Sequence, residues 1–498
     1  MTNVTDHSVI ESLDPQPVWR IFSGIASVPR PSKREQQIRA HIAQLSTSLG
    51  FKSREDHVGN LLIEVAATKG YEDGAPTILQ GHLDMVCEKN AGTTHDFDKD
   101  PIRLLLEKTA EGRQIVRADG TTLGADNGIG VALALAAASD PKAIHGPLEI
   151  LCTIDEEAGM TGAKAIDGAF FNGRRMLNLD SEEDDALYIG CAGGTDTTLI
   201  WTLPTIALGQ GAEICHIAVS GLKGGHSGCD IHLNRGSAIS LLAQALQLVK
   251  EPHLQLAGIC GGSKRNAIPR EASATVAGPR GLTARLKECA KGIQSEAVAN
   301  GEANCRITIE PATASLAISG PDTQRVLAAI VALPHGVLAV VPDIPGLVQT
   351  SNGTTTISSN AADRSLRIEV GCLSRSSSNS EMSSVLRRIA AIARLAGAAA
   401  ECANEYPGWS PNVHSPTLAV CRHAYERVFN KPPRIASIHA GLECGIIGER
   451  VGGMDMVSFG PNIQGAHSPD ECVDVGSVKR MYEYLLAVLA DLAMERKH

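Results

Sequence analysis

Aromatic residues are scarce in this 498-residue sequence: Phe, Tyr and Trp together make up 3% of it. Basic residues are fewer than acidic ones, 45 against 55, and they form no continuous basic block. Proteins that bind nucleic acids need positive charge against the phosphates and aromatic rings on which bases can stack. The composition therefore predicts a protein with no nucleic-acid partner.

Long apolar segments are absent too. The longest uncharged apolar stretch, residues 326–341, is interrupted by Pro334, His335 and Gly336. It is shorter than the roughly 20 residues that a helix needs to cross a bilayer. The first twenty residues are polar and acidic and lack the apolar core of a signal peptide. We therefore expect a soluble, cytoplasmic protein with no membrane partner.

None of the 13 cysteines belongs to a Cys-x-x-Cys motif. An odd number of scattered cysteines in a large chain is typical of reduced thiols in a reducing compartment. Most of them are expected to be small core residues, as buried cysteines usually are. We expect neither a catalytic cysteine nor a zinc site built from cysteine.

What the sequence does contain is a set of histidines and carboxylates in short segments rich in glycine and aspartate. There are seven of them: His82 and Asp84 in GHLDMV, Asp126 in LGADNGIG, Glu156 and Glu157 in CTIDEEAGM, Asp180 in LNLDSEE, and His467 in GAHSPDE. A binuclear zinc hydrolase needs a bridging carboxylate, two further ligands for each metal, and a free carboxylate that accepts a proton from the attacking water. The set meets that requirement.

Several of these side chains follow apolar runs that predict strands, at residues 77–79, 148–154 and 176–179. In open α/β sheets, functional groups gather at the carboxyl ends of the strands. Residues two apart on a strand face the same way, so His82 and Asp84 would project together. A carboxylate often holds the second ring nitrogen of a metal-binding histidine, and Asp84 is expected to do this for His82.

Each segment also has a simpler interpretation when it is taken alone. His82 and Asp84 could be a polar pair at a strand end, and Asp126 a helix N-cap. Glu156 and Glu157 could form a solvated acidic turn. Adjacent carboxylates repel unless a cation or a shared proton offsets their charge, so one of this pair could bind metal while the other holds the nucleophilic water. Spacing alone does not say which does which.

The order of the segments predicts a catalytic domain made of two parts of the chain, because six of the seven residues precede position 181 and His467 lies near the end. We expect residues 1–190 and 398–498 to form an α/β catalytic domain, with a mixed, mostly parallel sheet and helices on both faces. Residues 191–397, which open with a glycine-rich turn, are expected to form an inserted α+β lid domain.

The motifs GHLDMV, TTLGADNGIG, TIDEEAGMTGA, LNLDSEE and GAHSPDE resemble those of the aminoacylase-type di-zinc metallopeptidases, over nearly the whole chain. Their order and the large insert look most like the bacterial dipeptidases of that family. The resemblance implies two Zn²⁺ ions per subunit, for which Mn²⁺ or Co²⁺ could substitute. It also implies a homodimer that hydrolyses small peptides with broad specificity, including Xaa-His dipeptides.

The resemblance further implies a role for each residue of the set. Five would bind metal: His82 and Asp180 one ion, Glu157 and His467 the other, and Asp126 both. Asp84 would orient His82, and Glu156 would be the general base.

The resemblance implies that three residues of the insert contact the carbonyl or carboxylate of the substrate: His226 in GGHSG, Asn266 in RNAIP, and Arg375 in LSRSS. His439, in a loop of small residues, is a weaker candidate for a functional histidine. Glu443 receives no role, because the wider family often has an aspartate at this place.

The same metal residues would also serve an N-acyl-amino-acid deacylase or a carboxypeptidase, and the sequence does not separate these activities from dipeptide hydrolysis. A catalytically inactive peptide-binding protein is a further alternative. Glu156 and Asp84 argue against it, since a binding protein needs ligands but no base.

Overall fold

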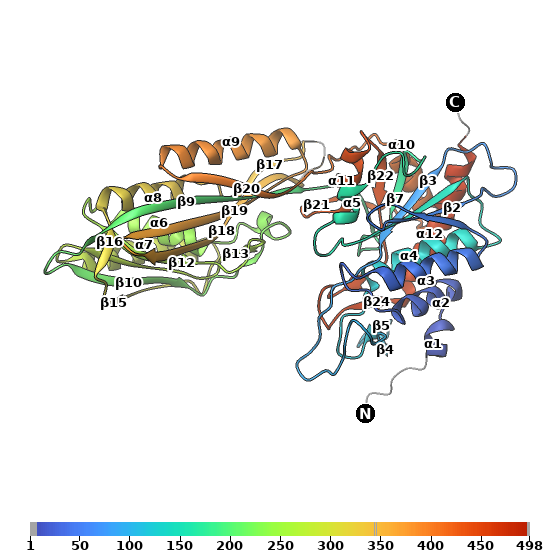
Figure 1. The fold of residues 1–498 in the computed structure, drawn as a ribbon, viewed down its shortest axis with the longest axis horizontal. Helices are drawn as coiled ribbons and strands as arrows, with labels where there is room; N and C mark the ends of the chain where they lie inside the picture. The colour runs from blue at the N-terminus through green and yellow to red at the C-terminus, as the bar shows by residue number, and fades with distance from the viewer. Residues whose placement is uncertain (1–6, 343, 345, 496–498) are drawn as a thin grey trace. The chain divides into compact units, whose positions relative to one another are not determined.

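The computed structural model describes residues 7–342, 344 and 346–495, and the chain separates into two compact units (Figure 1). Unit 1 consists of Met1–Gly190, Pro411–Ser437 and Leu442–His498. Unit 2 consists of Cys191–Ser410 and Ile438–Gly441. Residues 1–6 and 496–498, at the outer ends of the expected catalytic segments, lie outside the described residues.

The main sheet of unit 1 has eight strands in the order β1-β2-β6-β3-β7-β22-β8-β21. Their bounds are β1 (Lys52–Glu55), β2 (Leu61–Val65), β3 (Thr77–His82), β6 (Leu148–Thr153), β7 (Arg175–Asn178), β8 (Ala186–Cys191), β21 (Arg434–Ile438) and β22 (Asp455–Ser458). Strands β6, β3, β7 and β22 run parallel to one another, whereas β1–β2, β2–β6 and β22–β8 pair antiparallel. The four central strands therefore end at the same edge of the sheet.

Helices cover this sheet: α1 (His7–Glu11), α2 (Gln16–Ala26), α3 (Gln36–Ser48), α4 (Ala125–Ser139), α5 (Thr161–Ala165), α10 (Pro416–Phe429), α11 (Glu443–Arg450) and α12 (Val475–Met494). Helix α4 packs on β3 and β6, and both strands are buried along their whole length. Helix α4 consists largely of alanine, glycine and leucine and is itself almost wholly buried. A Cβ at Gly130 would overlap the carbonyl oxygen of Leu179, so only glycine lets this helix approach the end of β7 so closely.

A second sheet of unit 1 joins distant parts of the sequence. Its strands lie in the order β23-β24-β5-β4, with bounds β4 (Leu104–Lys108), β5 (Gln114–Ala118), β23 (Ile463–Gln464) and β24 (Cys472–Asp474). Val473 of β24 pairs with Val116 of β5, and both are fully buried. This pairing anchors the loop between β23 and β24, which carries His467, against the first half of unit 1.

Unit 2 is built on a ten-stranded sheet in the order β15-β10-β14-β12-β18-β19-β9-β16, with β17 paired to β18 and β20 paired to β9. The bounds are β9 (Gly193–Ala207), β10 (Glu213–Ser220), β12 (Gln255–Gly261), β14 (Ala272–Gly278), β15 (Arg306–Pro311), β16 (Leu316–Ile318), β17 (Gly336–Val340), β18 (Val348–Ala362), β19 (Ser365–Ser376) and β20 (Ala399–Tyr406). Its strand pairs are antiparallel.

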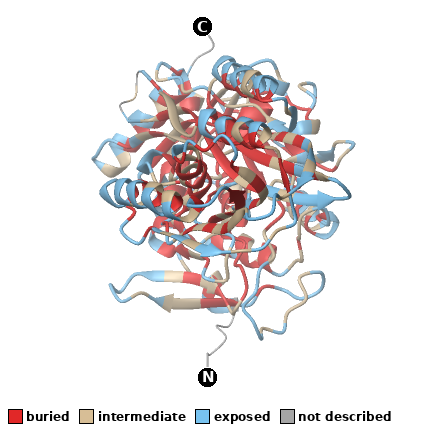
Figure 2. Cartoon of the chain, turned by 90° about the vertical axis from the view of Figure 1, so that its left-hand side faces the viewer, coloured by how far each residue is buried: buried red, intermediate tan, exposed pale blue. Residues whose placement is uncertain are grey.

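The helices of unit 2 share one apolar core with this sheet. They are α6 (Ala238–Leu248), α7 (Leu282–Ala299), α8 (Gly320–Ala332) and α9 (Asn379–Leu395), beside the short η1 (Ile231–Leu233) and the strand pair β11 (Gly225–His226) and β13 (Ala267–Ile268). Ile217 of β10, Leu242 of α6 and Ile389 of α9 are all fully buried in that core. The helices accordingly show a buried and an exposed side (Figure 2). The arrangement is α+β, and the expected fold class is confirmed.

The second boundary of unit 2 differs from the expected one at residue 397. Strand β20 lies beyond that position and pairs with β9 from Ala399 opposite Ile200 onward, so residues 398–410 belong to unit 2. Ile438–Gly441 also belong to it. The sequence did not reveal this strand because β20 is exposed along nearly its whole length and so lacks the alternation of apolar and polar residues that marks a half-buried strand.

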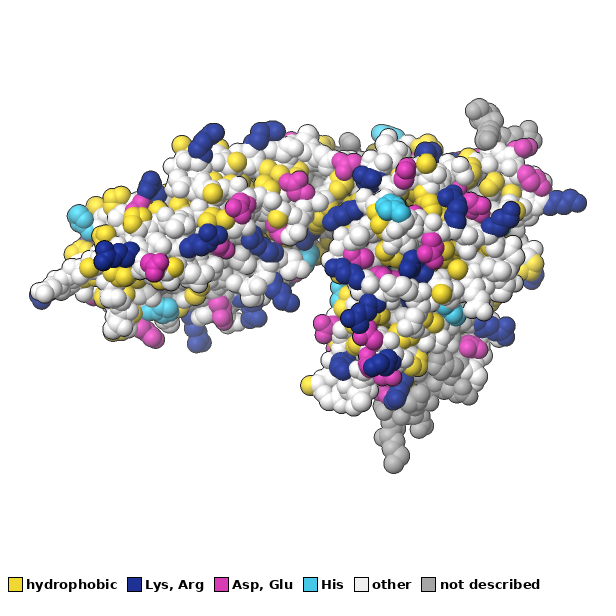
Figure 3. Space-filling model, viewed as in Figure 1, with side chains coloured by type: hydrophobic (Ala, Val, Ile, Leu, Met, Phe, Trp, Pro, Cys, Tyr) yellow, Lys and Arg dark blue, Asp and Glu magenta, His cyan; other side chains and the backbone are white. Residues whose placement is uncertain are grey.

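Within the described residues, no helix is both long and apolar enough to cross a membrane. On the face that Figure 3 shows, acidic and basic side chains are interspersed over the surface of each unit.

Candidate metal centre

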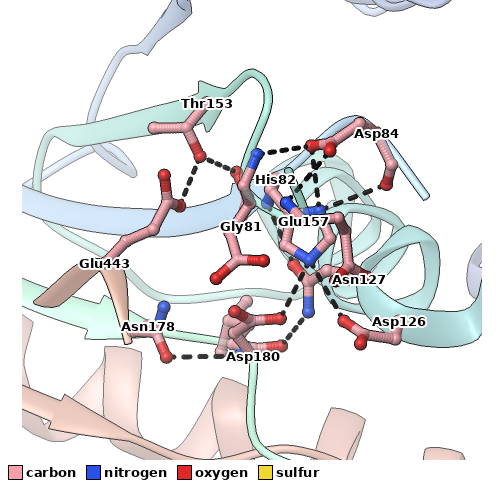
Figure 4. A network of polar contacts seen from close by, with 12 residues as sticks. Gly81, His82, Asp84, Asp126, Asn127, Thr153, Glu157, Asn178, Asp180 and Glu443 are labelled. Carbon is pink, nitrogen blue, oxygen red and sulfur yellow. Dashed lines mark hydrogen bonds and ion pairs between the residues drawn. The ribbon is translucent and has the colours of Figure 1, made fainter. Parts of the chain in front are cut away.

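Three of the predicted side chains come from neighbouring parallel strands. His82 is the last residue of β3, Glu157 follows β6, and Asp180 follows β7. Because β3 pairs in parallel with both β6 and β7, the three chain segments leave the sheet at one edge. Figure 4 shows their side chains directed into the same space. Local strand formation and sheet topology together account for this convergence.

Asp126 reaches this space from the start of α4. Gly124 is the N-cap, with a φ of 69°, and Asp126 and Asn127 have non-helical backbone angles. Asp126 is therefore not the N-cap residue of this helix. The side chain of Asn127 accepts from the N–H of His82 at 3.3 Å and donates to the carbonyl of Leu179 at 2.8 Å. Asn127 thereby holds the segment that carries Asp126 against the ends of β3 and β7.

The two imidazoles lie on opposite oxygens of the Asp126 carboxylate. Nε2 of His82 is 3.1 Å from Oδ1, and Nε2 of His467 is 3.1 Å from Oδ2. Each imidazole has a second carboxylate beside it. Nε2 of His82 is 3.5 Å from Oδ1 of Asp180, and Nε2 of His467 is 3.1 Å from Oε2 of Glu157. The five side chains therefore form two groups of three ligand atoms that share Asp126.

These atoms are close enough to contact a common cation. His82, Asp126 and Glu157, which span the two groups, each offer one ligand atom, and the three atoms lie within 4.8 Å of one another. Among the described residues, the buried Oε1 of Glu157 has no hydrogen-bond partner, and the buried Oδ1 of Asp180 has only Nε2 of His82 beside it, at 3.5 Å. Buried carboxylate oxygens without donors are costly, and a bound metal ion would satisfy them. The donor set of nitrogen and oxygen atoms fits zinc or a similar divalent ion.

The carboxylates strongly perturb one another and the imidazoles. Burial lowers the pKa of His82, but Asp180 and Asp126 outweigh it, so that the pKa lies well above 6.5. Hydrogen bonds to the carboxylates of Asp126 and then Glu157, which accept from the ring, raise the pKa of His467 to about 11. Both rings are thus poised to hold positive charge between anions. A metal ion would supply that charge and bind the rings in their neutral form.

The pKa values of two carboxyl groups are raised as well, which favours their neutral form. Burial, with the charges of Asp126 and Glu157, raises the pKa of Asp180 to about 7 against the attraction of His82. Burial also raises the pKa of Glu156 well above 4.5, and Asp180 adds to this effect. The N–H of Glu156 donates to Asp84, and the charges of His82, Asp180, Glu443 and Glu157 all act on its carboxyl group. Carboxylates gathered this closely need cations between them.

Asp84 links the first histidine to the acidic pair. Its Oδ1 is 3.4 Å from Nδ1 of His82, and the backbone oxygen of Asp84 is 3.1 Å from the same nitrogen. The N–H groups of Glu156 and Glu157 donate to its carboxylate at 3.0 and 3.2 Å. The hydroxyl of Ser32 donates to it at 2.7 Å. Burial opposes ionisation of Asp84, but the hydrogen bonds and charge of His82 lower its pKa to about 2.

Sequence reasoning assigned no role to Glu443, which lies directly behind the strand ends. Its side chain is fully buried and accepts from the amide of Gln80 at 2.6 Å and the hydroxyl of Thr153 at 2.5 Å. Burial raises its pKa to about 8, and Asp180 contributes. Nothing in its local sequence distinguishes it from an ordinary acidic residue at a helix start. Only the tertiary structure brings it here.

The remaining candidate residues, His226, Asn266, Arg375 and His439, all belong to unit 2. The N–H groups of Gly228 and Cys229 donate to Nδ1 of His226 at 3.2 and 2.9 Å. Nδ1 is therefore an acceptor, and the ring proton of neutral His226 resides on Nε2. Burial and then the charge of Arg375 lower the pKa of His226, which favours this neutral form. Asn266 is exposed, and its backbone oxygen accepts from the N–H of Ser227 at 2.8 Å.

Arg375 and His439 lie near this histidine. Arg375 is 5% exposed and donates to the hydroxyl of Tyr406 at 3.1 Å. Its buried Nε has no hydrogen-bond partner within the described residues. Gly228 permits the close packing, since a Cβ there would overlap the carbonyl oxygen of His439 and lie 3.0 Å from Nε of Arg375. Burial, then Arg375, lowers the pKa of His439 to about 3.

Comparison with known proteins now identifies the family of this site. The model of peptidase family M20/M25/M40 matches residues 78–491. The chain belongs to this family. The expected resemblance and the prediction of a peptidase are therefore confirmed.

Individual members of the M20/M25/M40 family agree with this assignment. The chain is 41% identical to the cytosol non-specific dipeptidase of Escherichia coli, over 97% of this chain and 99% of that one. A solved structure of aminoacylhistidine dipeptidase from Vibrio alginolyticus is 40% identical, with a TM-score of 0.87 over 98% of this chain and 99% of that one. A tripeptidase from Staphylococcus aureus shares the fold, at 14% identity and a TM-score of 0.59, over 97% of this chain and 100% of its own.

Removal of metal is expected to destabilise the protein, because five ionisable ligands then face one another without a cation. Restoring an ion that binds only the folded state should stabilise it by about 2.7 kcal/mol at an ion concentration one hundred times its Kd. Calorimetric melting of chelated and zinc-restored samples, with metal content determined by elemental analysis, measures this difference. An unchanged melting temperature in a sample that takes up no zinc would contradict the metal-site interpretation.

Proposed function

We propose that this member of the M20/M25/M40 family is a dipeptidase that binds two zinc ions per chain and hydrolyses small peptides with broad specificity, Xaa-His dipeptides included. The names of the relatives from Escherichia coli and Vibrio alginolyticus support dipeptides as the substrate class. The observation that carries the proposal is the division of the ligand atoms into two groups on either side of Asp126.

In this proposal, His82 and Asp180 would hold one ion, His467 and Glu157 would hold the other, and Asp126 would contribute to both. Both nitrogen and carboxylate oxygen are ordinary zinc ligands, and the excess of oxygen would also accept Mn²⁺ or Co²⁺. When bound, the two ions would polarise the scissile carbonyl and lower the pKa of water. The orphaned oxygen of Glu157 supports this assignment.

Glu156 is the proposed general base. Its carboxylate would accept a proton from the attacking water and pass it to the nitrogen of the departing amine. A base works best when its pKa lies near the working pH, and burial moves the pKa of Glu156 upward from 4.5, in that direction. Asp84 would position both partners, because its carboxylate accepts from the N–H of Glu156 and contacts His82.

Unit 2 is the proposed lid and carries substrate-binding residues. Nε2 of His226 would donate to the oxygen of the scissile carbonyl as that oxygen gains negative charge. The guanidinium of Arg375 would bind the carboxylate of the dipeptide, and its unpartnered Nε supports this role. Asn266, held next to His226 through Ser227, would contribute a further polar contact.

Location and assembly belong to the same proposal. We place the protein in the cytoplasm, supported by the word "cytosol" in the name of the Escherichia coli relative. The homodimer implied by the sequence resemblance is retained, and the molar mass of the purified protein in solution tests it.

The dipeptidase proposal predicts a preference for a free amino terminus. Acetylation removes the positive charge that the surrounding carboxylates attract, so kcat/KM should fall more than tenfold, a difference of about 1.4 kcal/mol in transition-state binding. Initial rates on matched free and N-acetylated dipeptides, including an Xaa-His pair, measure the preference. Faster hydrolysis of the acetylated peptides would instead identify a deacylase.

The two adjacent glutamates should respond differently to loss of charge. Glu156→Gln is expected to retain both metal ions and to lower kcat by about 10²–10⁴, the usual contribution of a general base. Glu157→Gln is expected to lose metal, because it removes a ligand. Metal content from elemental analysis and kcat are measured for both variants. Each variant is the control for the other. The reverse pattern would exchange their roles.

His226→Ala should lower kcat by about 10²–10³, the usual contribution of one donor to an oxyanion, while metal content stays unchanged. His216→Ala is the matched control, since His216 is a half-buried histidine of the same unit and contacts the hydroxyl of Thr275 at 3.3 Å. Steady-state kinetics on a good dipeptide substrate gives both values. Equal kcat in the two variants would remove His226 from the mechanism.

A further inference from the structure

Two charged residues outside the ligand set are buried next to the metal centre. Arg30 and Glu471 are each 2% exposed. Arg30 lies between α2 and α3, before the first residue that the family model matches, and Glu471 directly precedes β24. Burying a charge without partners is strongly unfavourable, so the contacts of these two side chains need an explanation.

Glu471 joins the loop of one histidine to the loop of the central aspartate. Its Oε2 accepts from the N–H groups of Leu123 and Gly124 at 2.7 and 2.9 Å, and its Oε1 accepts from the N–H of Asp126 at 3.2 Å. Glu471 itself stands four residues after His467 in the loop between β23 and β24. Three charge-assisted hydrogen bonds therefore fix the backbone of Asp126 relative to the segment that carries His467.

Arg30 joins the same aspartate loop to the end of β3. Its guanidinium donates to the backbone oxygens of Leu83 and Asp84, both at 2.9 Å, and to the backbone oxygen of Gly124. Gly124 has a positive φ, and a Cβ there would overlap the guanidinium. The segment that follows His82 is thereby tied to the segment that precedes Asp126.

The negative charge of Glu471 also reduces the cost of burying Arg30. Burial lowers the pKa of Arg30, and the carboxylate of Glu471 is the first of the charges that oppose this shift. Burial raises the pKa of Glu471, and the N–H groups of Gly124 and Asp126 oppose that shift. An opposite charge nearby lowers the free-energy cost of burying a charged group. Removing the carboxylate of Glu471 would therefore raise the cost of burying Arg30.

We propose that Arg30 and Glu471 are a pair of positioning residues that fix the three chain segments bearing His82, Asp126 and His467, so that each imidazole faces its own oxygen of the aspartate. Neither residue touches the reacting atoms. The inference rests on the proposed function, since it assumes that these segments hold metal. Two buried charged residues outside the metal-ligand set thereby receive a role.

The test is metal affinity in Glu471→Gln. The amide keeps the shape of the side chain but places an NH₂ group against at least one of the three N–H groups that the carboxylate satisfies. Loss of a residue that orients metal ligands typically weakens metal binding 10–100-fold. We expect that loss for the weaker-bound ion, a fall in kcat with little change in KM, and an altered visible spectrum of the Co²⁺-loaded protein.

Glu149→Gln is the matched control. Glu149 is a 4% exposed carboxylate on β6, and it accepts from the N–H groups of Asn172 and Gly173 at 2.8 and 2.7 Å. It lies near the start of that strand, whereas the metal centre lies beyond its end. This variant should lower the melting temperature as Glu471→Gln does, but leave metal affinity and the Co²⁺ spectrum unchanged.

Arg30→Lys is the second variant, and it tests the positioning role if Glu471→Gln does not fold. Lysine keeps the charge but loses the planar fork, so it cannot donate to all three carbonyls in the same geometry. The positioning role would be overturned if Arg30→Lys kept the metal affinity and the Co²⁺ spectrum of the wild type. It would also be overturned if Glu471→Gln lost no more metal affinity than Glu149→Gln. Failure of the unmutated protein to bind metal would instead overturn the proposed function.

Discussion

The repulsion among buried carboxylates is the constraint on which the rest of this structure depends. Asp126, Glu157 and Asp180 lie in one buried cluster, and burial, together with the charges of Asp126 and Glu157, raises the pKa of Asp180 to about 7. Nothing in ordinary packing rewards such an arrangement, because burying one carboxylate already disfavours its charge. Divalent cations reverse the sign of the interaction. In the proposed function, the same residues that destabilise the protein without metal would become its ligands, which would couple folding to metal binding.

The strands and helices around the site fix the distances between its charged side chains. Parallel strands deliver His82 and Asp180 to one edge of the sheet, and the small residues of α4 allow Asp126 to reach the same edge. The pairing of β24 with β5 brings His467 from the far end of the sequence. Backbone pairing makes the strand connections, and the side chain of Asn127 holds the start of α4 against β3 and β7, so the spacing between the two imidazoles and Asp126 is set by the fold.

The sequence predicted the strand ends well and the supporting charges poorly, for a physical reason. Apolar runs directly precede His82 and Asp180, so a local pattern places both at the end of a strand. His467 lies in a loop without periodicity, and its role came from the family resemblance. The sequence did not single out Arg30 and gave Glu443 no role, because the burial of both depends on contacts with residues more than fifty positions away. The predicted boundary of unit 2 at residue 397 was wrong for a similar reason, since β20 is exposed and its partner strand β9 is distant in the sequence.

Asp126 is proposed to bind two metal ions at once. Diffraction from crystals grown with zinc, recorded on either side of the zinc absorption edge, tests this bridging role. Two anomalous peaks are expected in each chain, one between His82 and Asp180 and the other between His467 and Glu157, each next to a different oxygen of Asp126. A single peak, or peaks that leave Asp126 without a metal, would contradict it.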